Sequence, residues 1–299
     1  MTTALTKPLE PPLPGGREGT SVRLHPLLSG EILAPLGLLE RRTPFVMARA
    51  IGIGVPKSRR VWIPAPVFLI EHPGAGGILV DTGVHPRAQL EPRRTMGVAS
   101  SWLYEFRSGP DGDLPSQLRA RRVEPADVRI VVMTHLHTDH ASAAAEFPQA
   151  TFVVDRRDWA AANRRPGFVN GYDPRHFAHA FDWRLVDFDA LGAAPTVGFD
   201  SALDLFGDGT VRLIATPGHT PGHMSVLVLT GERKVLLTAD AAYTQRTINE
   251  CAMPGIARSH RQFRASLGQI QRFRDRHPDA LVITGHDREQ WPTLKPLYA

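Results

Sequence analysis

The stretch Thr134-His135-Leu136-His137-Thr138-Asp139-His140 decides how the rest of this sequence is interpreted. It directly follows an apolar run at 128–133 that is typical of a buried strand. Imidazole and carboxylate groups suit divalent zinc, iron, cobalt or manganese. A single histidine at such a place is more often a packing or capping residue. Three histidines and an aspartate in one turn after a buried strand instead indicate ligands for two adjacent metal ions.

Three later segments repeat this arrangement, in which an apolar run leads into a potential ligand beside small residues. They are Thr216-Pro217-Gly218-His219-Thr220-Pro221-Gly222-His223 after the run 211–215, Asp240 after the run 235–239, and Gly285-His286-Asp287 after the run 280–284. Asp240 or His286 alone would more often be a turn, cap or core residue. Ligands at strand ends share one rim of an α/β sheet, so the order of these segments predicts that they meet there.

Short runs rich in Val, Ile and Leu recur along the chain, and helical patterns lie between them. The clearest helix is predicted at 260–276, between a capping box formed by Ser259 with Gln262 and a terminating Pro278. Weaker helical patterns cover two further segments, 114–122 and 155–163. Alternating strands and helices indicate a layered α/β protein.

Composition fits a globular chain of 299 residues, with 42% hydrophobic and 22% charged residues. Residues 1–20 are rich in Pro and Gly, which predicts a flexible or extended N-terminal tail before a single folded domain at 21–299. The net charge of +5 comes from Arg residues scattered along the chain, so we expect no nucleic-acid partner.

The sequence has no clear targeting signal, and it contains a single cysteine. We expect no membrane association, since no apolar stretch reaches the roughly 18 residues of a membrane span. The N-terminus lacks the apolar segment of a secretory signal, and a cytoplasmic location is the default expectation. Cys251 is the single cysteine, which excludes intrachain disulfides and a cysteine-based metal cage.

The ordered set HLHTDH, TPGHTPGH, TAD and TGHD resembles the metallo-β-lactamase superfamily from about residue 60 to 290. The early Asp81-Thr82-Gly83 also resembles a strand end of that fold. The resemblance implies an αββα sandwich with metals at one edge. Two features depart from the family pattern: Ala141-Ser142-Ala143 stands where many members have Ala-Gly-Gly, and the long interval between the histidine motifs suggests an insertion near 163–205.

The resemblance also implies a ligand set for two metal ions. It assigns His135, His137 and His219 to the first ion, Asp139, His140 and His286 to the second, and Asp240 to a bridge between them. His223 matches a position that supports the ligands. We expect two divalent ions per chain, with zinc favoured and manganese, iron or cobalt open, and no organic cofactor.

Several branches of the superfamily fit less well. β-Lactamases with a cysteine ligand are disfavoured, because Asp240 occupies the bridging position and Cys251 lies elsewhere. Glyoxalase II has a helical C-terminal domain, and the chain after His286 is too short for one. The nucleases carry an inserted domain and the flavodiiron proteins a flavodoxin domain, and neither is expected here.

Tyr243, three residues after Asp240, makes the sequence similar to the N-acyl-homoserine lactone lactonases, in which this tyrosine contacts the substrate carbonyl. The resemblance implies a quorum-quenching lactonase in which a hydroxide shared by the two ions attacks the lactone carbonyl. Tyr243 would donate to the oxyanion, and Asp139 would carry a proton to the leaving alkoxide. A packing role for Tyr243 stays open, as does another esterase, thioesterase or phosphotriesterase activity on a small ester. A non-enzymatic or redox protein that keeps the fold is the remaining alternative.

Two apolar segments could line an acyl-chain pocket, although burial in the core or contact within a homodimer explains them equally well. They are Phe45, Val46, Met47, Ile51, Ile53 and Val55 in the first, and Trp102, Leu103, Tyr104 and Phe106 in the second.

Overall fold

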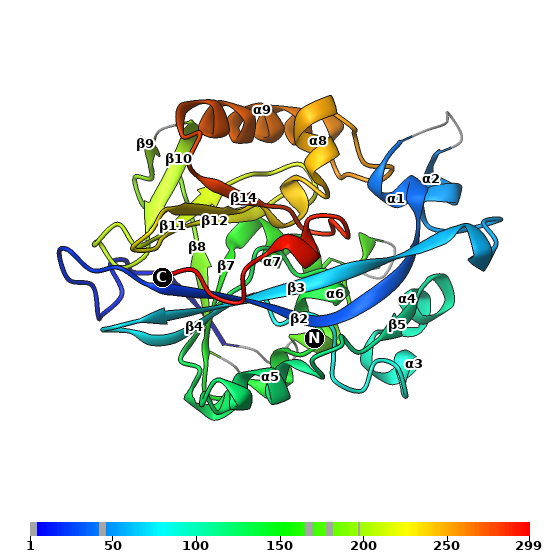
Figure 1. The fold of residues 1–299 in the computed structure, drawn as a ribbon, viewed down its shortest axis with the longest axis horizontal. Helices are drawn as coiled ribbons and strands as arrows, with labels where there is room; N and C mark the ends of the chain where they lie inside the picture. The colour runs from blue at the N-terminus through cyan, green and yellow to red at the C-terminus, as the bar shows by residue number, and fades with distance from the viewer. Residues whose placement is uncertain (1–4, 42–45, 165–169, 178–181, 197) are drawn as a thin grey trace.

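Two β-sheets pack face to face, and helices cover their outer surfaces (Figure 1). The computed structural model describes residues 5–41, 46–164, 170–177, 182–196 and 198–299. The order of the larger sheet is β1 (Leu5–Pro8), β8 (Asp182–Val186), β7 (Thr151–Asp155), β6 (Ile130–Val132), β4 (Gly76–Val80), β3 (Arg60–His72), β2 (Arg23–Pro35) and β5 (Glu105–Arg107). The order of the smaller sheet is β14 (Leu281–Ile283), β13 (Lys234–Leu237), β12 (Met224–Leu229), β11 (Val211–Ala215), β10 (Phe199–Asp204) and β9 (Ala194–Thr196).

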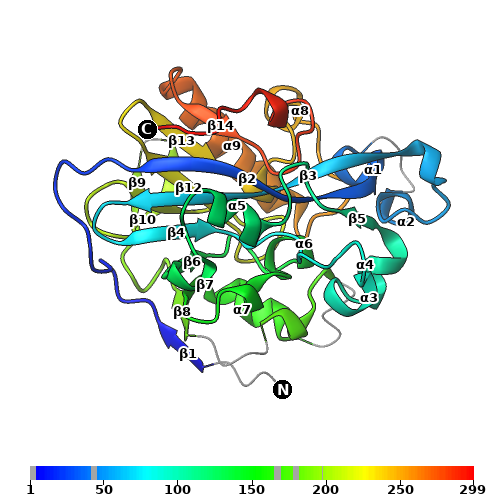
Figure 2. The same ribbon diagram turned by 60° about the horizontal axis from the view of Figure 1, so that its bottom comes forward.

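The helices lie outside the two sheets, which gives the predicted αββα layering (Figures 1 and 2). They are α1 (Leu36–Leu39), α2 (Val46–Ala50), α3 (Pro92–Thr95), α4 (Val98–Leu103), α5 (Leu114–Ala120), α6 (Thr138–Ala141), α7 (Arg156–Ala162), α8 (Gln245–Glu250) and α9 (His260–Arg276). Helix α9 packs on the smaller sheet, and α5 and α7 pack on the larger one. The αββα sandwich is therefore confirmed.

Strand pairing explains why the potential ligands share one edge. Strands β4, β6, β7 and β8 run parallel, so the segments that follow them leave the larger sheet at the same end. In the smaller sheet, β13 and β14 are parallel, and β11 and β12 are antiparallel. The turn after β11 therefore meets the ends of β13 and β14 at the edge reached by the loop after β6.

The core between the sheets comes from the alternating apolar residues of both. Ile78 and Val132 of the larger sheet and Leu213 and Val226 of the smaller one are all fully buried. Burying a side chain of this size stabilises the fold by roughly 1.5–3 kcal/mol. The sandwich thus gives the loops at its edge a rigid base.

Helix α9 follows its predicted pattern closely. Its buried side includes Phe263, Leu267, Ile270 and Phe273, the residues whose spacing is helical. The side chain of its N-cap, Ser259, accepts a hydrogen bond from the backbone N–H of Gln262 at 3.3 Å. The second half of the predicted capping box is wrong, because the Ser259 N–H donates to the Gly218 carbonyl at 2.9 Å. This bond instead ties the helix start to the turn that carries His219.

The N-terminal segment is extended over its described residues and packs against the two sheets. Strand β1 pairs in parallel with β8 at the edge of the larger sheet. Leu9 is 1% exposed, and the Leu13 N–H donates to the Leu205 carbonyl at 2.8 Å. A Cβ on Gly16 would lie 2.1 Å from the Phe206 carbonyl oxygen. Pro-rich sequence favours extended backbone, and apolar residues within it pack that backbone against the sheet.

The interval 163–205, expected to hold an insertion, supplies strands to both sheets. Strand β8 joins the larger sheet, and β9 and β10 form the edge of the smaller one. Residues 165–169, 178–181 and 197 of this interval lie outside the described residues.

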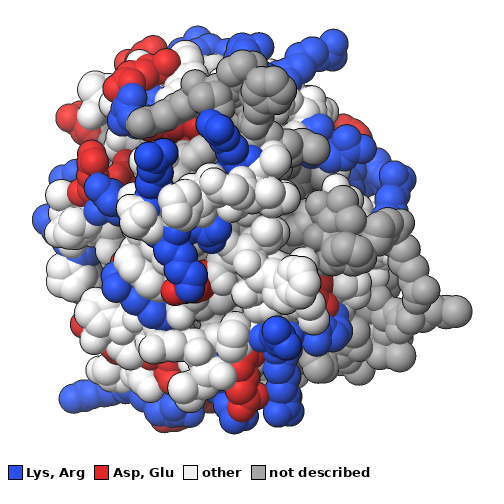
Figure 3. Space-filling view, turned by 90° about the vertical axis from the view of Figure 1, so that its right-hand side faces the viewer, with Lys and Arg blue, Asp and Glu red and all other residues white. Residues whose placement is uncertain are grey.

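The described residues contain no helix long and apolar enough to cross a membrane. On the face seen in Figure 3, Lys and Arg side chains are interspersed with Asp and Glu, and uncharged residues occupy much of the surface between them.

Candidate metal centre

The seven predicted ligands come together at one edge of the sandwich. His135 and His137 lie in the loop after β6, and Asp139 and His140 lie in the short helix α6 that follows. The other three come from turns of the smaller sheet. These are His219 between β11 and β12, Asp240 after β13, and His286 after β14.

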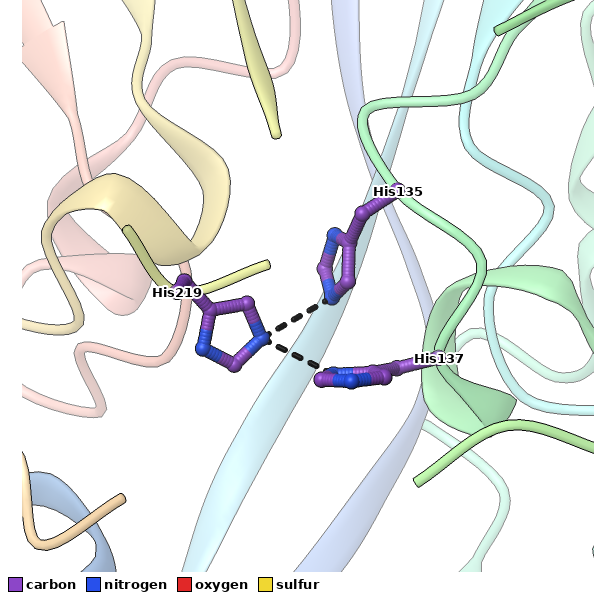
Figure 4. A group of neighbouring side chains, drawn as sticks. All are labelled: His135, His137 and His219. Carbon is purple, nitrogen blue, oxygen red and sulfur yellow. Dashed lines mark hydrogen bonds between the residues drawn. The ribbon is translucent and has the colours of Figure 1, made fainter. Parts of the chain in front are cut away.

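A first cluster consists of three histidines that point toward one another (Figure 4). His219 Nε2 lies 3.2 Å from His135 Nε2 and 2.8 Å from His137 Nδ1. Asp240 Oδ2 lies 3.2 Å from His219 Nε2 and 3.9 Å from His135 Nε2. Three converging imidazole nitrogens beside a carboxylate oxygen form a donor set that suits a divalent transition metal.

A second cluster lies on the other side of Asp240. His286 Nε2 is 3.2 Å from Asp240 Oδ1 and 3.5 Å from Asp139 Oδ2. His140 Nε2 is 3.4 Å from Asp240 Oδ1 and 3.8 Å from Asp139 Oδ2. The two oxygens of Asp240 therefore face different clusters, which is the geometry of a bridging carboxylate.

Two atoms of the second cluster lack partners that a buried polar atom needs. Among the described residues, His140 Nε2 and Asp240 Oδ1 are buried and form no hydrogen bond. Buried polar atoms without partners are rare in folded proteins, so each one calls for an explanation. Both atoms belong to groups whose ligand atoms lie within 4.8 Å of one another. The donor set therefore fits metal ions at both clusters.

Burial keeps the histidines of the first cluster in the neutral form that binds a metal ion. It lowers the pKa of His135, His137 and His219, so these imidazoles are neutral and offer lone pairs. Although burial opposes ionisation of Asp240, His286 and His140 hold the pKa of this carboxyl well below its usual range.

When no metal ion is bound, the histidines of the second cluster bind protons more tightly than free histidine does. Burial lowers the pKa of His140 and His286, but the charges of Asp240 and Asp139 and the direct contact of each ring with Asp240 together outweigh burial and raise the pKa of both. A cation between these groups would repel that proton. Metal binding at this cluster therefore releases protons and weakens as the solution becomes acidic.

In three of the ligand histidines, a neighbour holds the ring nitrogen that faces away from the clusters. His140 Nδ1 lies 2.8 Å from Asp81 Oδ2, and His286 Nδ1 donates to the Pro64 carbonyl at 2.8 Å. His135 Nδ1 lies 3.1 Å from Thr134 Oγ1, whose hydroxyl donates to Asp81 Oδ2. Such partners fix the orientation of the ring. The role of Asp81 went unassigned in the sequence, although the Asp-Thr-Gly motif marked its position.

His223 lies outside both clusters. Its Nε2 accepts a hydrogen bond from the backbone N–H of Asp240 at 3.1 Å, and its Nδ1 lies 2.9 Å from Thr216 Oγ1. His223 thus supports the backbone of the bridging carboxylate.

Tyr243 lies directly beside the clusters. It is 2% exposed, and its hydroxyl lies 3.1 Å from His219 Nδ1. Its ring stacks on His286, with centroids 5.4 Å apart and an interplanar angle of 22°. Burial and the nearby Asp240 raise the pKa of Tyr243 well above its usual value, so the hydroxyl keeps its proton at neutral pH.

Only some residues of the two apolar segments lie near the site. Phe106 is buried in a cluster that includes Tyr243, whereas Trp102 is 77% exposed and Ile53 57% exposed. Phe45 and the side chains of Val46 and Met47 lie outside the described residues. Tyr104 is near Asp139, and both burial and that charge raise its pKa. The sequence marked this tyrosine only as part of an apolar segment.

This fold and this donor set define a class of metal-dependent hydrolases. Residues 60–286 match the family model described as the metallo-beta-lactamase superfamily, and the chain belongs to that superfamily.

Within the superfamily, the chain is similar to several curated proteins. It is 36% identical over 236 residues to N-acyl homoserine lactonase AttM of Azorhizobium caulinodans, covering 78% of this chain and 85% of that protein. It is 31% identical over 265 residues to a probable metallo-hydrolase of Mycobacterium tuberculosis, covering 83% and 82% of the two chains.

Solved structures share the fold. An N-acyl homoserine lactone hydrolase with N-hexanoyl-L-homoserine at its catalytic metal centre superposes with a TM-score of 0.73 at 22% identity, covering 92% of this chain and 97% of that one. The dizinc quorum-quenching lactonase AidC gives a TM-score of 0.64 at 17% identity, covering 94% and 92%.

Proposed function

We propose that this protein is a dinuclear-metal hydrolase that opens the lactone ring of N-acyl-homoserine lactones and thereby quenches quorum signals. The observation that carries the proposal is the Tyr243 hydroxyl beside two clusters that share the Asp240 carboxylate. The names of curated relatives at 36% identity support the same substrate class.

We propose the seven clustered side chains as the metal ligands, with zinc as the favoured ion. His135, His137 and His219 would hold one ion, Asp139, His140 and His286 the other, and Asp240 would bridge them. Two bound divalent ions would supply the Lewis-acid chemistry that activates water and polarises a carbonyl.

Tyr243 is suited to stabilise the carbonyl oxygen as it gains charge. His219 turns its Nε2 toward the cluster, so its Nδ1 carries the proton and donates to the tyrosine oxygen. The hydroxyl hydrogen then faces the Asp240 carboxylate. With metal ions bound to that carboxylate, the hydroxyl could turn and donate to a substrate oxygen instead. A preorganised donor of this kind stabilises a developing oxyanion in a buried site.

Asp139 is suited to move a proton. Its side chain is 25% exposed, whereas those of His140 and His286 are 3% and 2% exposed. A substrate entering from solvent would therefore meet this carboxyl. Asp139 could take the proton that the attacking water gives up and pass it to the ring oxygen that leaves when the lactone opens.

The extent of the catalytic domain and the oligomeric state stay predictions. We propose that the domain spans residues 21–299, with β1 added to its larger sheet. A homodimer is the assembly that we expect.

A substrate panel tests the function. After its metal content has been measured, the purified enzyme is assayed with homoserine lactones of several acyl lengths, an acyclic ester, a thioester and a phosphotriester. We expect the highest kcat/KM with the lactones. A tenfold higher kcat/KM for any other class would replace the lactonase assignment with that activity.

A further inference from the structure

The carboxylate of Asp158, near the start of α7, is fully buried and has no part in the proposed chemistry. A buried carboxylate is costly unless several donors satisfy it. The hydrogen-bond partners of Asp158 therefore indicate its structural role.

The first partner of Asp158 lies in the loop of metal ligands. Asp158 Oδ2 accepts a hydrogen bond from the backbone N–H of Leu136 at 2.7 Å. Leu136 stands between His135 and His137, and its own side chain is buried in the core below. Fixing this peptide fixes the direction in which both flanking histidines project.

The second partner backs one of those histidines. Asp158 Oδ1 accepts a hydrogen bond from the Tyr172 hydroxyl at 3.0 Å. The Tyr172 ring lies 4.8 Å from the His137 ring, and the two residues form an isolated backbone bridge. The next residue along the loop, Thr138, donates its N–H to the Gly171 carbonyl at 3.2 Å. The segment 171–172 thus holds His137 on the side away from the cluster.

The start of α7 also touches the turn that carries the third histidine. A Cβ on Gly222 would lie 2.4 Å from the backbone nitrogen of Asp158, so this glycine allows close contact. Thr220, the residue after His219, also lies beside the Asp158 carboxylate. Helix α7 is therefore wedged against both loops that supply the three-histidine cluster.

The other cluster is held by different groups. Asp81 orients His140, and the Pro64 carbonyl orients His286. The hydrogen bonds of Asp158 with other described residues reach neither of these histidines. Asp158 thus supports the three-histidine cluster alone, whereas Asp81 reaches His140 directly and His135 through Thr134.

We propose that Asp158 is a positioning residue that aligns the three-histidine cluster of His135, His137 and His219 and sets the metal affinity of that cluster alone. The inference rests on the proposed two-ion centre. Support of this kind typically changes metal affinity about 10- to 100-fold.

The test measures zinc affinity by competition with a chromophoric chelator, a readout independent of turnover. Wild-type protein should show two binding events, and His137→Ala identifies the event that belongs to the three-histidine cluster. Asp158→Ala should weaken that event about 10- to 100-fold and leave the other within threefold. Asp158→Asn should restore most of the affinity, because its amide oxygen still accepts from Leu136 and its NH₂ can donate to the Tyr172 oxygen.

Asp208→Ala is the matched control, a buried carboxylate away from both clusters. Its side chain is 2% exposed, it accepts a hydrogen bond from the Thr210 hydroxyl, and it lies 3.0 Å from His72 Nε2. Its loss should lower the melting temperature and leave both zinc affinities unchanged.

The outcomes separate this inference from the proposed function. Wild-type protein that binds fewer than two ions would contradict the two-ion centre itself. Two wild-type events with unchanged affinities in Asp158→Ala, or with both weakened equally, would overturn the role of Asp158. If Asp158→Ala does not fold, the same zinc-affinity measurement on Tyr172→Phe tests the proposal. That substitution keeps the ring and removes one hydrogen bond, so we expect the same event to weaken at least about threefold. An unchanged affinity there would overturn the proposal.

Discussion

Replacing Tyr243 by phenylalanine separates a donor to the oxyanion from a packing residue. The change removes one oxygen and leaves the ring that stacks on His286. Tyr243 is not among the seven proposed ligands, so both ions should remain bound. Because those ions still carry most of the charge stabilisation, kcat/KM should fall about tenfold to a few hundredfold. That loss corresponds to about 1.4 to 3.4 kcal/mol in the transition state.

The same change has a small structural cost that can be predicted separately. His219 Nδ1 loses the acceptor that lies 3.1 Å away in the native protein. A buried donor without its partner costs about 1 kcal/mol or more, which lowers the melting temperature of a chain of this size by about 2 °C or more.

The assay compares wild type and Tyr243→Phe with lactones of several acyl lengths, together with metal content and melting temperature. The fall in kcat/KM should be the same for every acyl length, because the hydroxyl would contact the ring end of the substrate. An unchanged kcat/KM would refute the donor role. A loss confined to long acyl chains would instead place Tyr243 against the tail.

Two further perturbations test the bridge and a buried histidine away from the clusters. Asp240→Asn keeps the size of the side chain but removes the charge between two cations, so metal content and activity should fall together; two ions with full activity would show that Asp240 does not bridge. Burial lowers the pKa of His176 from 6.5 to about 4. The unfolded chain therefore binds this proton first as pH falls below 6.5, and about 2 to 3 kcal/mol of stability should be lost by pH 4.5. Urea unfolding at pH 7 and pH 4.5 should show a smaller loss in His176→Gln, and an equal loss in both proteins would contradict the assignment.

Local patterns predicted much of this structure. Periodic apolar spacing located α9, and the runs before each ligand became strands β6, β11, β13 and β14. The ligand order predicted which side chains meet, because residue type and position at a strand end are both visible in sequence. The segments 114–122 and 155–163 contain helices α5 and α7, as predicted.

Other features depend on contacts between distant segments, which spacing does not show. The pairing of β1 with β8 joins segments that lie far apart in the sequence. The Pro and Gly residues near the N-terminus therefore indicated only a flexible or extended tail, and not its place in the sheet. Helices α1 to α4 are too short for a periodic signal. Asp158 and Tyr172 gain their roles only when the fold brings them to Leu136 and His137.

The central claim is that seven side chains hold two metal ions across the Asp240 carboxylate. The most direct test is elemental analysis of protein purified without exposure to a chelator. We predict close to two divalent ions per chain, most of them zinc. One ion or none per chain would contradict the two-ion centre.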